Sequence, residues 1–192
     1  MVRGWELGLP FQAMKIRWVL LVFLTCLSAA RSLPAQNKRP VASEQTVFSA
    51  EDSGVKRPVS IPEDVMAILR KDEGVLPVLD YENVRPENLP ASWFSAAEVH
   101  LTLSSTPDLV VAAEPPLAGG NVDTFWVFRA TAHGHELMVT APAHSLALKS
   151  TRSHGYRDIE LLSNTAVAFH TVILRFDGTE YKVLRDKWAP IK

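Results

Sequence analysis

Cysteine is nearly absent from the sequence, since Cys26 is the only one in 192 residues. A single thiol cannot form an intramolecular disulfide, and without paired cysteines or an HExxH motif the chain has no standard zinc site. An excess of charge of one sign is also absent, because 20 Lys and Arg stand against 21 Asp and Glu. A chain without a basic surplus has no electrostatic footprint for nucleic acid. These absences exclude a disulfide scaffold, and nucleic acid is not expected as a partner.

A long hydrophobic run is the third absence. The longest apolar stretch covers about 13 residues, Trp18 to Ala30, whereas a membrane-spanning helix needs about 20. The stretch follows Lys15 and Arg17 and ends in small side chains, which is the three-part layout of a secretory signal. We therefore predict a signal peptide over residues 1–35, export to the periplasm or the extracellular space, and no membrane span after signal removal.

Two details of this signal stay open. Met14 starts a shorter and more regular signal than Met1 does, so either methionine can be the true start. Cleavage is expected within residues 30–35. A lipid anchor on Cys26 is the alternative, but a lipobox has a small residue immediately before its cysteine, and here that residue is Thr25.

The mature chain divides into a polar segment and a domain. Removing residues 1–35 takes away four basic and one acidic side chain, which leaves 16 Lys and Arg, 20 Asp and Glu, and a net charge of −4. Residues 36–60 are polar, punctuated by proline and without a hydrophobic period, so they are predicted to be a flexible linker. Residues 61–192 are predicted to form a single, mainly β domain.

One short helix is predicted at the start of this domain, over residues 62–71. Pro62 suits the first helical position. Acidic side chains follow in the first turn and basic ones close the last turn, as the helix dipole favours. Gly74 and Pro77 are expected to end helical structure, and the proline-containing stretch up to Pro90 is expected to be a loop.

Beyond residue 97 the pattern is that of strands, and it occurs twice. Each copy contains an alternating strand, a strand opening on Asp and an apolar residue, an apolar strand with an arginine near its end, and a glycine hairpin. The first copy opens on the alternation of Glu98 to Leu103. The matched positions are Asp108 with Asp158, Arg129 with Arg175, and Gly134 with Gly178. Residues 98–140 and 145–184 are therefore predicted to be internal repeats of one four-stranded antiparallel unit.

Two such units cannot close a β-propeller, which needs at least four blades. The predicted fold is therefore mainly β, with two tandem four-stranded antiparallel units that form one sheet or a sandwich, and with one short N-terminal helix. This helix, together with Trp93 and Phe94, is expected to cover an open edge or face of the sheets.

The second copy also carries a family resemblance. Residues 155–162 read GYRDIELL and residues 171–184 read TVILRFDGTEYKVL. These segments resemble the GYRDI…RFDGxxY signature of uncharacterised secreted bacterial β-domain proteins, and more loosely the FG-GAP and VCBS-type repeats of extracellular β-propellers. The resemblance implies export and a β fold but no activity. Such propeller repeats hold calcium on closely spaced aspartates, whereas each corresponding segment here has one acidic residue, so no calcium site is carried over.

Among six histidines, His133 and His135 form the closest pair. Residues two apart on a strand share a face, so these imidazoles could chelate zinc or copper. The shell would be completed by one of the nearest candidates, His144, His154 or Glu136. The competing interpretation is a hairpin tip around Gly134, where polar side chains meet water. We favour the hairpin tip, so neither a metal site nor a cofactor is predicted.

No residue is predicted to be catalytic, because the chain has no GxSxG elbow and its only cysteine lies in the signal. Polar residues nevertheless recur within the apolar strands, namely Asp108, Asp158, Arg129, Arg157 and Arg175. In a structural interpretation the aspartates accept backbone N–H bonds and pair with arginines of neighbouring strands. In a binding interpretation, an exposed recognition patch is formed by Tyr156, Arg157, Arg175 and Tyr181, since Arg and Tyr suit binding hot spots. The sequence does not separate the two interpretations.

The sequence thus favours a secreted or periplasmic noncatalytic β module that binds a protein or a cell-envelope component. An exported inhibitor of an envelope hydrolase is a special case, in which the loop Ala113–Val122 would protrude with its rigid Pro115 and Pro116. A metal-dependent hydrolytic enzyme that uses the His133/His135 region is the alternative from a different class. It requires these histidines to line a pocket.

Overall fold

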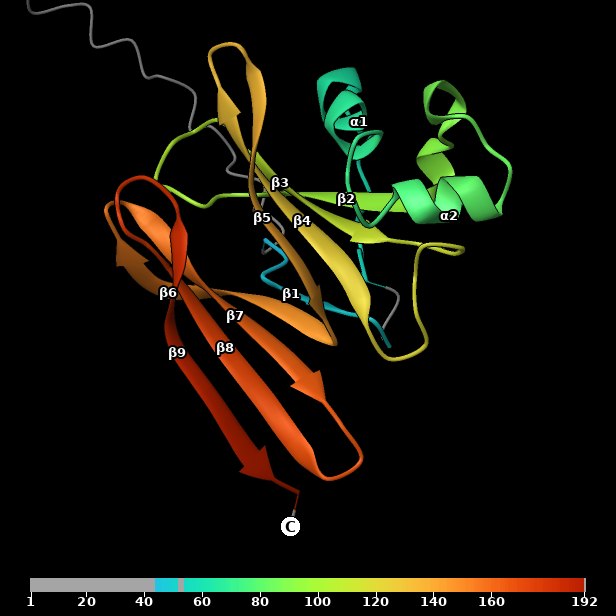
Figure 1. Ribbon diagram of the computed structural model, residues 1–192. Helices are drawn as coiled ribbons and strands as arrows, with labels where there is room; N and C mark the ends of the chain where they lie inside the picture. Colours follow the sequence, from blue (N-terminus) through green and yellow to red (C-terminus); the bar gives the residue numbers. More distant parts are fainter. Residues whose placement is uncertain (1–43, 52–53, 192) are drawn as a thin grey trace, which may run out of the picture. The chain divides into compact units, whose positions relative to one another are not determined.

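Two antiparallel sheets make up most of the protein in the computed structural model, which describes residues 44–51 and 54–191 (Figure 1). The prediction of a mainly β fold built from antiparallel units is confirmed, and residues 47–49 add a fifth strand to the second unit. The predicted signal peptide, 1–35, and the part of the predicted linker before residue 44 lie outside the described residues.

The first sheet has four strands in the order β2-β3-β4-β5, so every strand pairs with its neighbour in the sequence. Its strands are β2 (Phe94–Val99), β3 (Asp108–Ala113), β4 (Asp123–Thr131) and β5 (Gly134–Ala143). The second sheet has the order β1-β6-β7-β8-β9. Its strands are β1 (Val47–Ser49), β6 (Ser145–Ser153), β7 (Tyr156–Asn164), β8 (Ala168–Phe176) and β9 (Tyr181–Pro190). Only His144 separates β5 from β6, so the chain passes from one sheet to the other within one residue.

Apolar side chains between the two sheets form one half of the core. Phe125 and Val127 on β4 belong to the same buried cluster as Leu146 on β6 and Ile159 on β7. Phe48 of β1 lies in this cluster with no exposed surface. Because both sheets contribute alternate residues to one apolar layer, they pack face to face as a sandwich.

Two helices cover the other face of the four-stranded sheet (Figure 1). They are α1 (Glu63–Leu69) and α2 (Leu76–Tyr81). Leu69 of α1 and Leu79 of α2 are buried in one cluster with Trp126 and Phe128 of β4. β4 is therefore covered on both faces, which explains its nearly continuous apolar sequence. Among the described residues, no helix is long and apolar enough to cross a membrane.

Residues 44–51 and 54–60 are not a linker, although the prediction assigns 36–60 to one. β1 pairs antiparallel with β6, and Phe48 is fully buried. Val55 joins the same core cluster, and Val59 forms an isolated bridge to β2. Single apolar residues several positions apart anchor this segment to the core. Because such spacing has no hydrophobic period, the sequence pattern predicts a linker here.

The helix predicted over 62–71 is present as the shorter α1, with Pro62 at its N-cap. The stretch that follows is not a loop, because it contains α2 and two 3₁₀ helices, Pro86–Asn88 and Ala91–Trp93. Pro77 does not end helical structure. It lies in the first turn of α2, where its missing N–H would have no intrahelical partner.

The first strand of the first unit begins and ends at lower residue numbers than predicted. The alternating pattern predicts a strand from Glu98 to Leu103, whereas β2 covers Phe94–Val99. β2 ends at Val99, and Leu103 is 88% exposed in the following loop. Leu101 is buried, but its backbone N–H donates to the carboxylate of Asp108 at 2.8 Å. The Asp108 carboxylate therefore accepts a backbone N–H that a longer strand would donate to its neighbour. This competition explains why β2 ends at Val99.

The matched positions of the two units occupy corresponding places. Gly134 lies at the turn between the third and fourth strands of the first unit with φ +118°, and Gly178 lies at the same turn of the second unit with φ +109°. Asp108 and Asp158 are both buried on the second strand of their unit. The internal repeat at the level of sequence stays a prediction.

Part of the five-stranded sheet extends beyond the four-stranded one. In Figure 1 the ends of β8 and β9 near the C-terminus run away from the four-stranded sheet. β9 is the edge strand, and most of its side chains are exposed. Trp188 is 58% exposed and stacks on the His170 ring, with ring centroids 4.1 Å apart. His170 Nε2 is also 2.8 Å from the carboxylate of Asp186.

Candidate functional site

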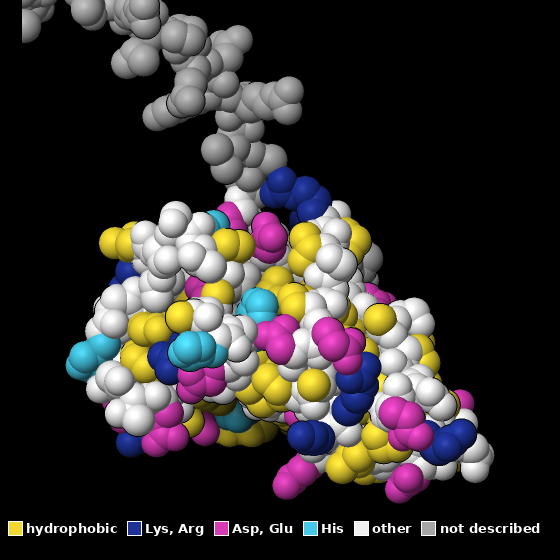
Figure 2. Space-filling view, turned by 90° about the horizontal axis from the view of Figure 1, so that it is seen from above, with side chains coloured by type: hydrophobic (Ala, Val, Ile, Leu, Met, Phe, Trp, Pro, Cys, Tyr) yellow, Lys and Arg dark blue, Asp and Glu magenta, His cyan; other side chains and the backbone are white. Residues whose placement is uncertain are grey.

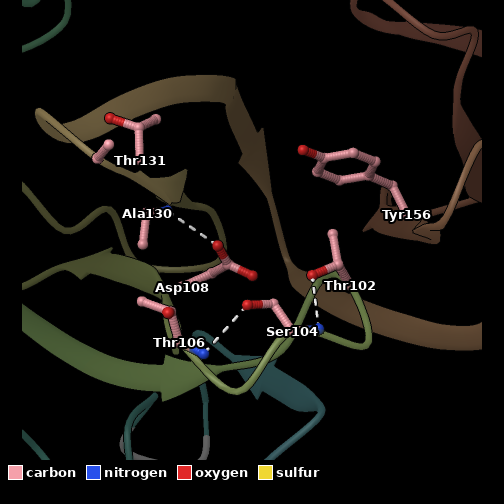
Figure 3. Close-up of a pocket in the computed structure, with 8 residues that line it drawn as sticks. Thr102, Ser104, Thr106, Asp108, Ala130, Thr131 and Tyr156 are labelled. Atoms are coloured by element: carbon pink, nitrogen blue, oxygen red, sulfur yellow. Dashed lines mark hydrogen bonds between the residues drawn. The ribbon is translucent and has the colours of Figure 1, made fainter.

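A polar pocket of about 360 Å³ opens where the two sheets meet, and Figure 3 shows its lining. Three segments build it: the loop between β2 and β3, the end of β4 with its turn, and the start of β7. Its polar lining consists of Thr102, Ser104, Thr106, Asp108, Thr131 and Tyr156. The volume lies within the range of about 300–1,000 Å³ that is typical of small-molecule sites. We refer to it as the hydroxyl pocket.

Asp108 is the buried charged residue of the hydroxyl pocket, with 5% of its surface exposed. One carboxylate oxygen accepts the Leu101 N–H at 2.8 Å, and the other accepts the Ala130 N–H at 2.9 Å. These two bonds fix the carboxylate between the β2–β3 loop and β4. Since each carboxylate oxygen has a second lone pair, Asp108 can still accept hydrogen bonds from a ligand.

The hydroxyl groups of the pocket are only partly used by the protein. Thr102 Oγ1 accepts the Ser104 N–H, and Ser104 Oγ accepts the Thr106 N–H, both at 3.1 Å. A hydroxyl that accepts one bond keeps its own proton for donation. The Thr106 hydroxyl forms no hydrogen bond with any residue that the structure describes. The Thr131 hydroxyl, by contrast, is committed to the β4–β5 turn.

Tyr156, one of the predicted binding residues, forms a wall of the hydroxyl pocket. Its hydroxyl points toward the other labelled residues in Figure 3 and accepts a hydrogen bond from Arg129 Nη1 at 3.2 Å. Its ring packs on Phe176 with centroids 4.3 Å apart. Arg129 is itself held by Glu136, whose carboxylate accepts from Nε at 2.8 Å. These contacts fix the ring, and the hydroxyl proton stays available for donation.

Arg157 has a structural role. Its guanidinium pairs with Glu44 at 3.2 Å, and its backbone N–H donates to Leu101 O at 2.8 Å. The Glu44 carboxylate also accepts the backbone N–H of His100. Arg157 therefore fastens the residues before β1 and the β2–β3 loop to β7.

Arg175 and Tyr181 also have partners within the protein. Arg175 donates two hydrogen bonds to Asp158, and these bonds hold the pKa of that carboxyl below its usual range. Tyr181 donates its hydroxyl proton to Arg157 O at 2.8 Å. Burial, followed by nearby negative groups that include Asp108, raises the pKa of the Tyr181 hydroxyl.

Of the four predicted binding residues, only Tyr156 lines the hydroxyl pocket. Arg157 and Arg175 are held by Glu44 and Asp158 instead. Sequence reasoning missed the hydroxyl side chains of the β2–β3 loop. Their signal was the Ser- and Thr-rich run at 101–108, LTLSSTPD, because such hydroxyls at strand ends often bond to backbone N–H groups and form ordered loops.

His133 and His135 have different environments. His133 is exposed at the β4–β5 turn. Asp64 Oδ2 accepts the His135 backbone N–H at 2.7 Å and lies 2.9 Å from His135 Nδ1. Burial alone would raise the pKa of Asp64, but the hydrogen bonds from His135 hold it below its usual range. Within 44–51 and 54–191, no three His, Cys, Asp or Glu side chains gather as metal ligands would.

A third buried carboxylate, Asp123, lines a pocket of about 330 Å³ beside the loop 114–120. Asp123 is 6% exposed, and its carboxylate forms no hydrogen bond with another described residue. Burial raises its pKa, and the nearby His144 opposes that effect. His144 Nδ1 is 3.1 Å from Asn121 O.

Comparison of the chain with protein-family models, with curated proteins and with solved structures finds no match in any of the three.

Proposed function

We propose that this protein is an exported, noncatalytic β module that binds a partner protein through the free edge of β9. The observation that carries the proposal is the exposure of this ten-residue edge strand. The edge of a sheet presents unpaired backbone N–H and C=O groups, which can accept a strand from another chain. The large exposed hydrophobic side chains on this strand are Val183, Leu184 and Trp188. Exposed apolar side chains gathered on one strand are typical of an interaction site.

The side chains of β9 indicate which kind of partner strand can pair with its edge. Alternation places Arg185 and Lys187 on one face and Asp186 and Trp188 on the other. Within the described residues, neither Arg185 nor Lys187 forms an ion pair. A partner strand with acidic side chains opposite these two cations and an apolar side chain opposite Trp188 matches both faces.

A second copy of this chain matches the edge less well. Antiparallel pairing of two β9 strands centred on Asp186 would bring Arg185 of each chain opposite Lys187 of the other. Like charges directly opposite each other are unfavourable, and basic side chains on an edge strand commonly prevent self-association. The proposed partner is therefore a different protein.

Export is supported by the sequence of residues 1–35, whose basic, apolar and small segments follow one another as in a signal peptide. The surface agrees with a partner other than a polyanion, because acidic and basic side chains are interspersed on the face shown in Figure 2. Intact mass of the secreted protein tests export. An N-terminus within residues 31–36 is expected, and a cytoplasmic protein that keeps its leader would contradict it.

Site-specific photocrosslinking tests the binding proposal. The full chain is expressed with p-benzoylphenylalanine at position 188, at position 81, or at position 122. Trp188 is on β9, Tyr81 is an 83% exposed control at the end of α2, and Val122 is in the loop that an inhibitor would use. We expect a discrete protein adduct from position 188 and none from position 81.

The outcomes separate the hypotheses. An adduct only from position 122 would favour the inhibitor alternative, and equal adducts from 188 and 81, or none, would contradict the β9 proposal. Trp188→Ser should also abolish capture of the same partner by the purified protein, whereas the matched Tyr81→Ser should leave capture unchanged. Thermal unfolding of both variants confirms that they are folded.

A further inference from the structure

The hydroxyl pocket offers more hydrogen-bonding groups than the protein uses. Asp108 keeps lone pairs on both carboxylate oxygens, because each oxygen accepts only one backbone N–H. Thr102, Ser104 and Thr106 each keep a hydroxyl proton, as does Tyr156. Unused donors and acceptors that lie side by side suit a ligand whose neighbouring groups each donate and accept. Sugar hydroxyls have this property.

Asp108 supplies the fixed part of such a site. Two backbone N–H groups hold its carboxylate at 2.8 and 2.9 Å, so no side-chain freedom has to be lost when a ligand binds. Preorganised groups of this kind raise affinity by lowering the entropic cost of association. A carboxylate accepts from two adjacent hydroxyls at once, and a hexose ring carries such pairs.

Tyr156 supplies an aromatic wall. The ring is held by Phe176 at a centroid distance of 4.3 Å, and its hydroxyl is held by Arg129. A rigid tyrosine offers contact area with little loss of conformational entropy. The C–H groups of a sugar ring are the apolar surface that would pack on this wall while the hydroxyls face the polar side chains.

Charge in the pocket disfavours an anionic ligand. Asp108 is the only charged residue among those that line it. Its negative charge disfavours anions, and it also contributes, after burial, to the raised pKa of the neighbouring Tyr181 hydroxyl. One carboxylate surrounded by hydroxyls is a poor match for a metal ion, which prefers several charged ligands.

We propose that the hydroxyl pocket binds a neutral hexose unit. Asp108 accepts hydrogen bonds from two adjacent sugar hydroxyls, Ser104 and Thr106 donate to sugar oxygens, and Tyr156 packs on the ring. The lining contains no exposed β9 residue, so this inference is independent of the proposed function and goes beyond it.

Saturation-transfer-difference NMR on the full chain tests the inference. The probes are methyl α-D-glucopyranoside, methyl α-D-mannopyranoside and methyl β-D-galactopyranoside, with glucose 6-phosphate as the anionic counterpart. We expect saturation transfer to the ring protons of at least one neutral glycoside and weaker binding of the phosphate. Thr106→Val should weaken binding about tenfold, the effect of losing one hydrogen bond.

Controls match each substitution in residue type. Thr179→Val alters an exposed threonine in the β8–β9 turn, and Tyr81→Ala matches Tyr156→Ala. Tyr156→Ala should abolish saturation transfer, while both control variants should leave it unchanged. The Thr106 hydroxyl makes no hydrogen bond within the described chain, so Thr106→Val is expected to fold and gives a result even if Tyr156→Ala does not.

Three results would overturn the inference. They are the absence of saturation transfer to all three neutral glycosides, tighter binding of glucose 6-phosphate than of the methyl glucoside, and equal binding by Thr106→Val and the unsubstituted protein. Loss of partner capture through Trp188 would have no bearing on any of them, so the two proposals fail separately.

Discussion

Arg175 on β8 donates two hydrogen bonds to Asp158 on the neighbouring strand β7, from Nε at 3.1 Å and from Nη2 at 2.8 Å. The Asp158 side chain is 2% exposed, whereas the Arg175 side chain is 42% exposed. The matched carboxylate of the first unit, Asp108, accepts two backbone N–H bonds instead, and Arg129 pairs with Glu136. The two units therefore supply different hydrogen-bond donors to their buried aspartates: backbone N–H groups to Asp108 and an arginine side chain to Asp158.

Arg175→Ala is expected to lower the free energy of unfolding by about 1–3 kcal/mol at neutral pH, because it leaves a buried carboxylate short of hydrogen bonds. The bonds from Arg175 lower the folded-state pKa of Asp158. Their contribution is therefore fully present above the unfolded-state pKa of about 3.9 and is lost as pH falls through the lower folded value. Thermal unfolding between neutral pH and about pH 3 measures this, and a pH-independent difference would contradict it.

A matched control is Lys182→Ala. Lys182 pairs with Asp177 at 2.8 Å, but its side chain is 61% exposed. Exposed ion pairs contribute little because solvent screens them, so this variant should be nearly as stable as the unsubstituted protein.

His135→Ala should destabilise the protein by about 0.5–1.5 kcal/mol, because the ring bond to Asp64 holds α1 against β5. His133→Ala should change stability by less than about 0.5 kcal/mol, since His133 is exposed. Urea unfolding of both variants provides the measurement. Equal stability of the two would mean that the Asp64 contact has no energetic weight.

Gly134→Ala is expected to cost more than Gly178→Ala. Both positions have positive φ, which strains a residue with a Cβ by about 1–2 kcal/mol. At Gly134 a Cβ would also lie 2.5 Å from Asp64 Oδ2, whereas at Gly178 the nearest atom, on His154, is 3.5 Å away. Gly120→Ala, where no atom lies within 4 Å of the new Cβ, is the control. Thermal denaturation should rank the three in that order of cost.

Asp123→Asn should stabilise the protein at neutral pH. Burial raises the folded-state pKa of Asp123, so the folded state holds a proton more tightly than the unfolded chain does. The unsubstituted protein therefore loses stability as pH rises from the unfolded value of about 3.9 through the raised folded value. Asn carries no charge and should not show this loss. Stability curves of the two proteins that run parallel from about pH 3 to neutral pH would refute this account.

The strands that sequence reasoning found are those with a strong local pattern. TFWVFR and TVILRF are long apolar segments, and both lie within strands, β4 and β8. β1 has three residues and one buried side chain, Phe48, so no periodicity exists to reveal it. α2 contains Pro77. In a sequence pattern proline predicts the end of a helix, although it is tolerated in the first helical turn, where Pro77 lies.

The hydroxyl pocket could be predicted only in part. The sequence predicts Tyr156 as a binding residue, but its neighbours Thr102 and Thr106 lie in the loop between β2 and β3, far earlier in the chain. Which loop meets which strand depends on how the two sheets pack, and a single sequence does not contain that information in local form.

β1 has a consequence for the order of assembly. Strands β2 to β5 and β6 to β9 each pair with a neighbour in the sequence, whereas β1 pairs with a strand much later in the chain, β6, with Val47 opposite Ala147. Contacts between distant residues require closure of a long loop and form late in folding. Phe48 therefore packs into the core after the hairpins have formed. Shortening its side chain, as in Phe48→Ala, should speed unfolding while leaving the folding rate nearly unchanged. The segment that precedes the helices in the sequence would then be the first to leave the native structure.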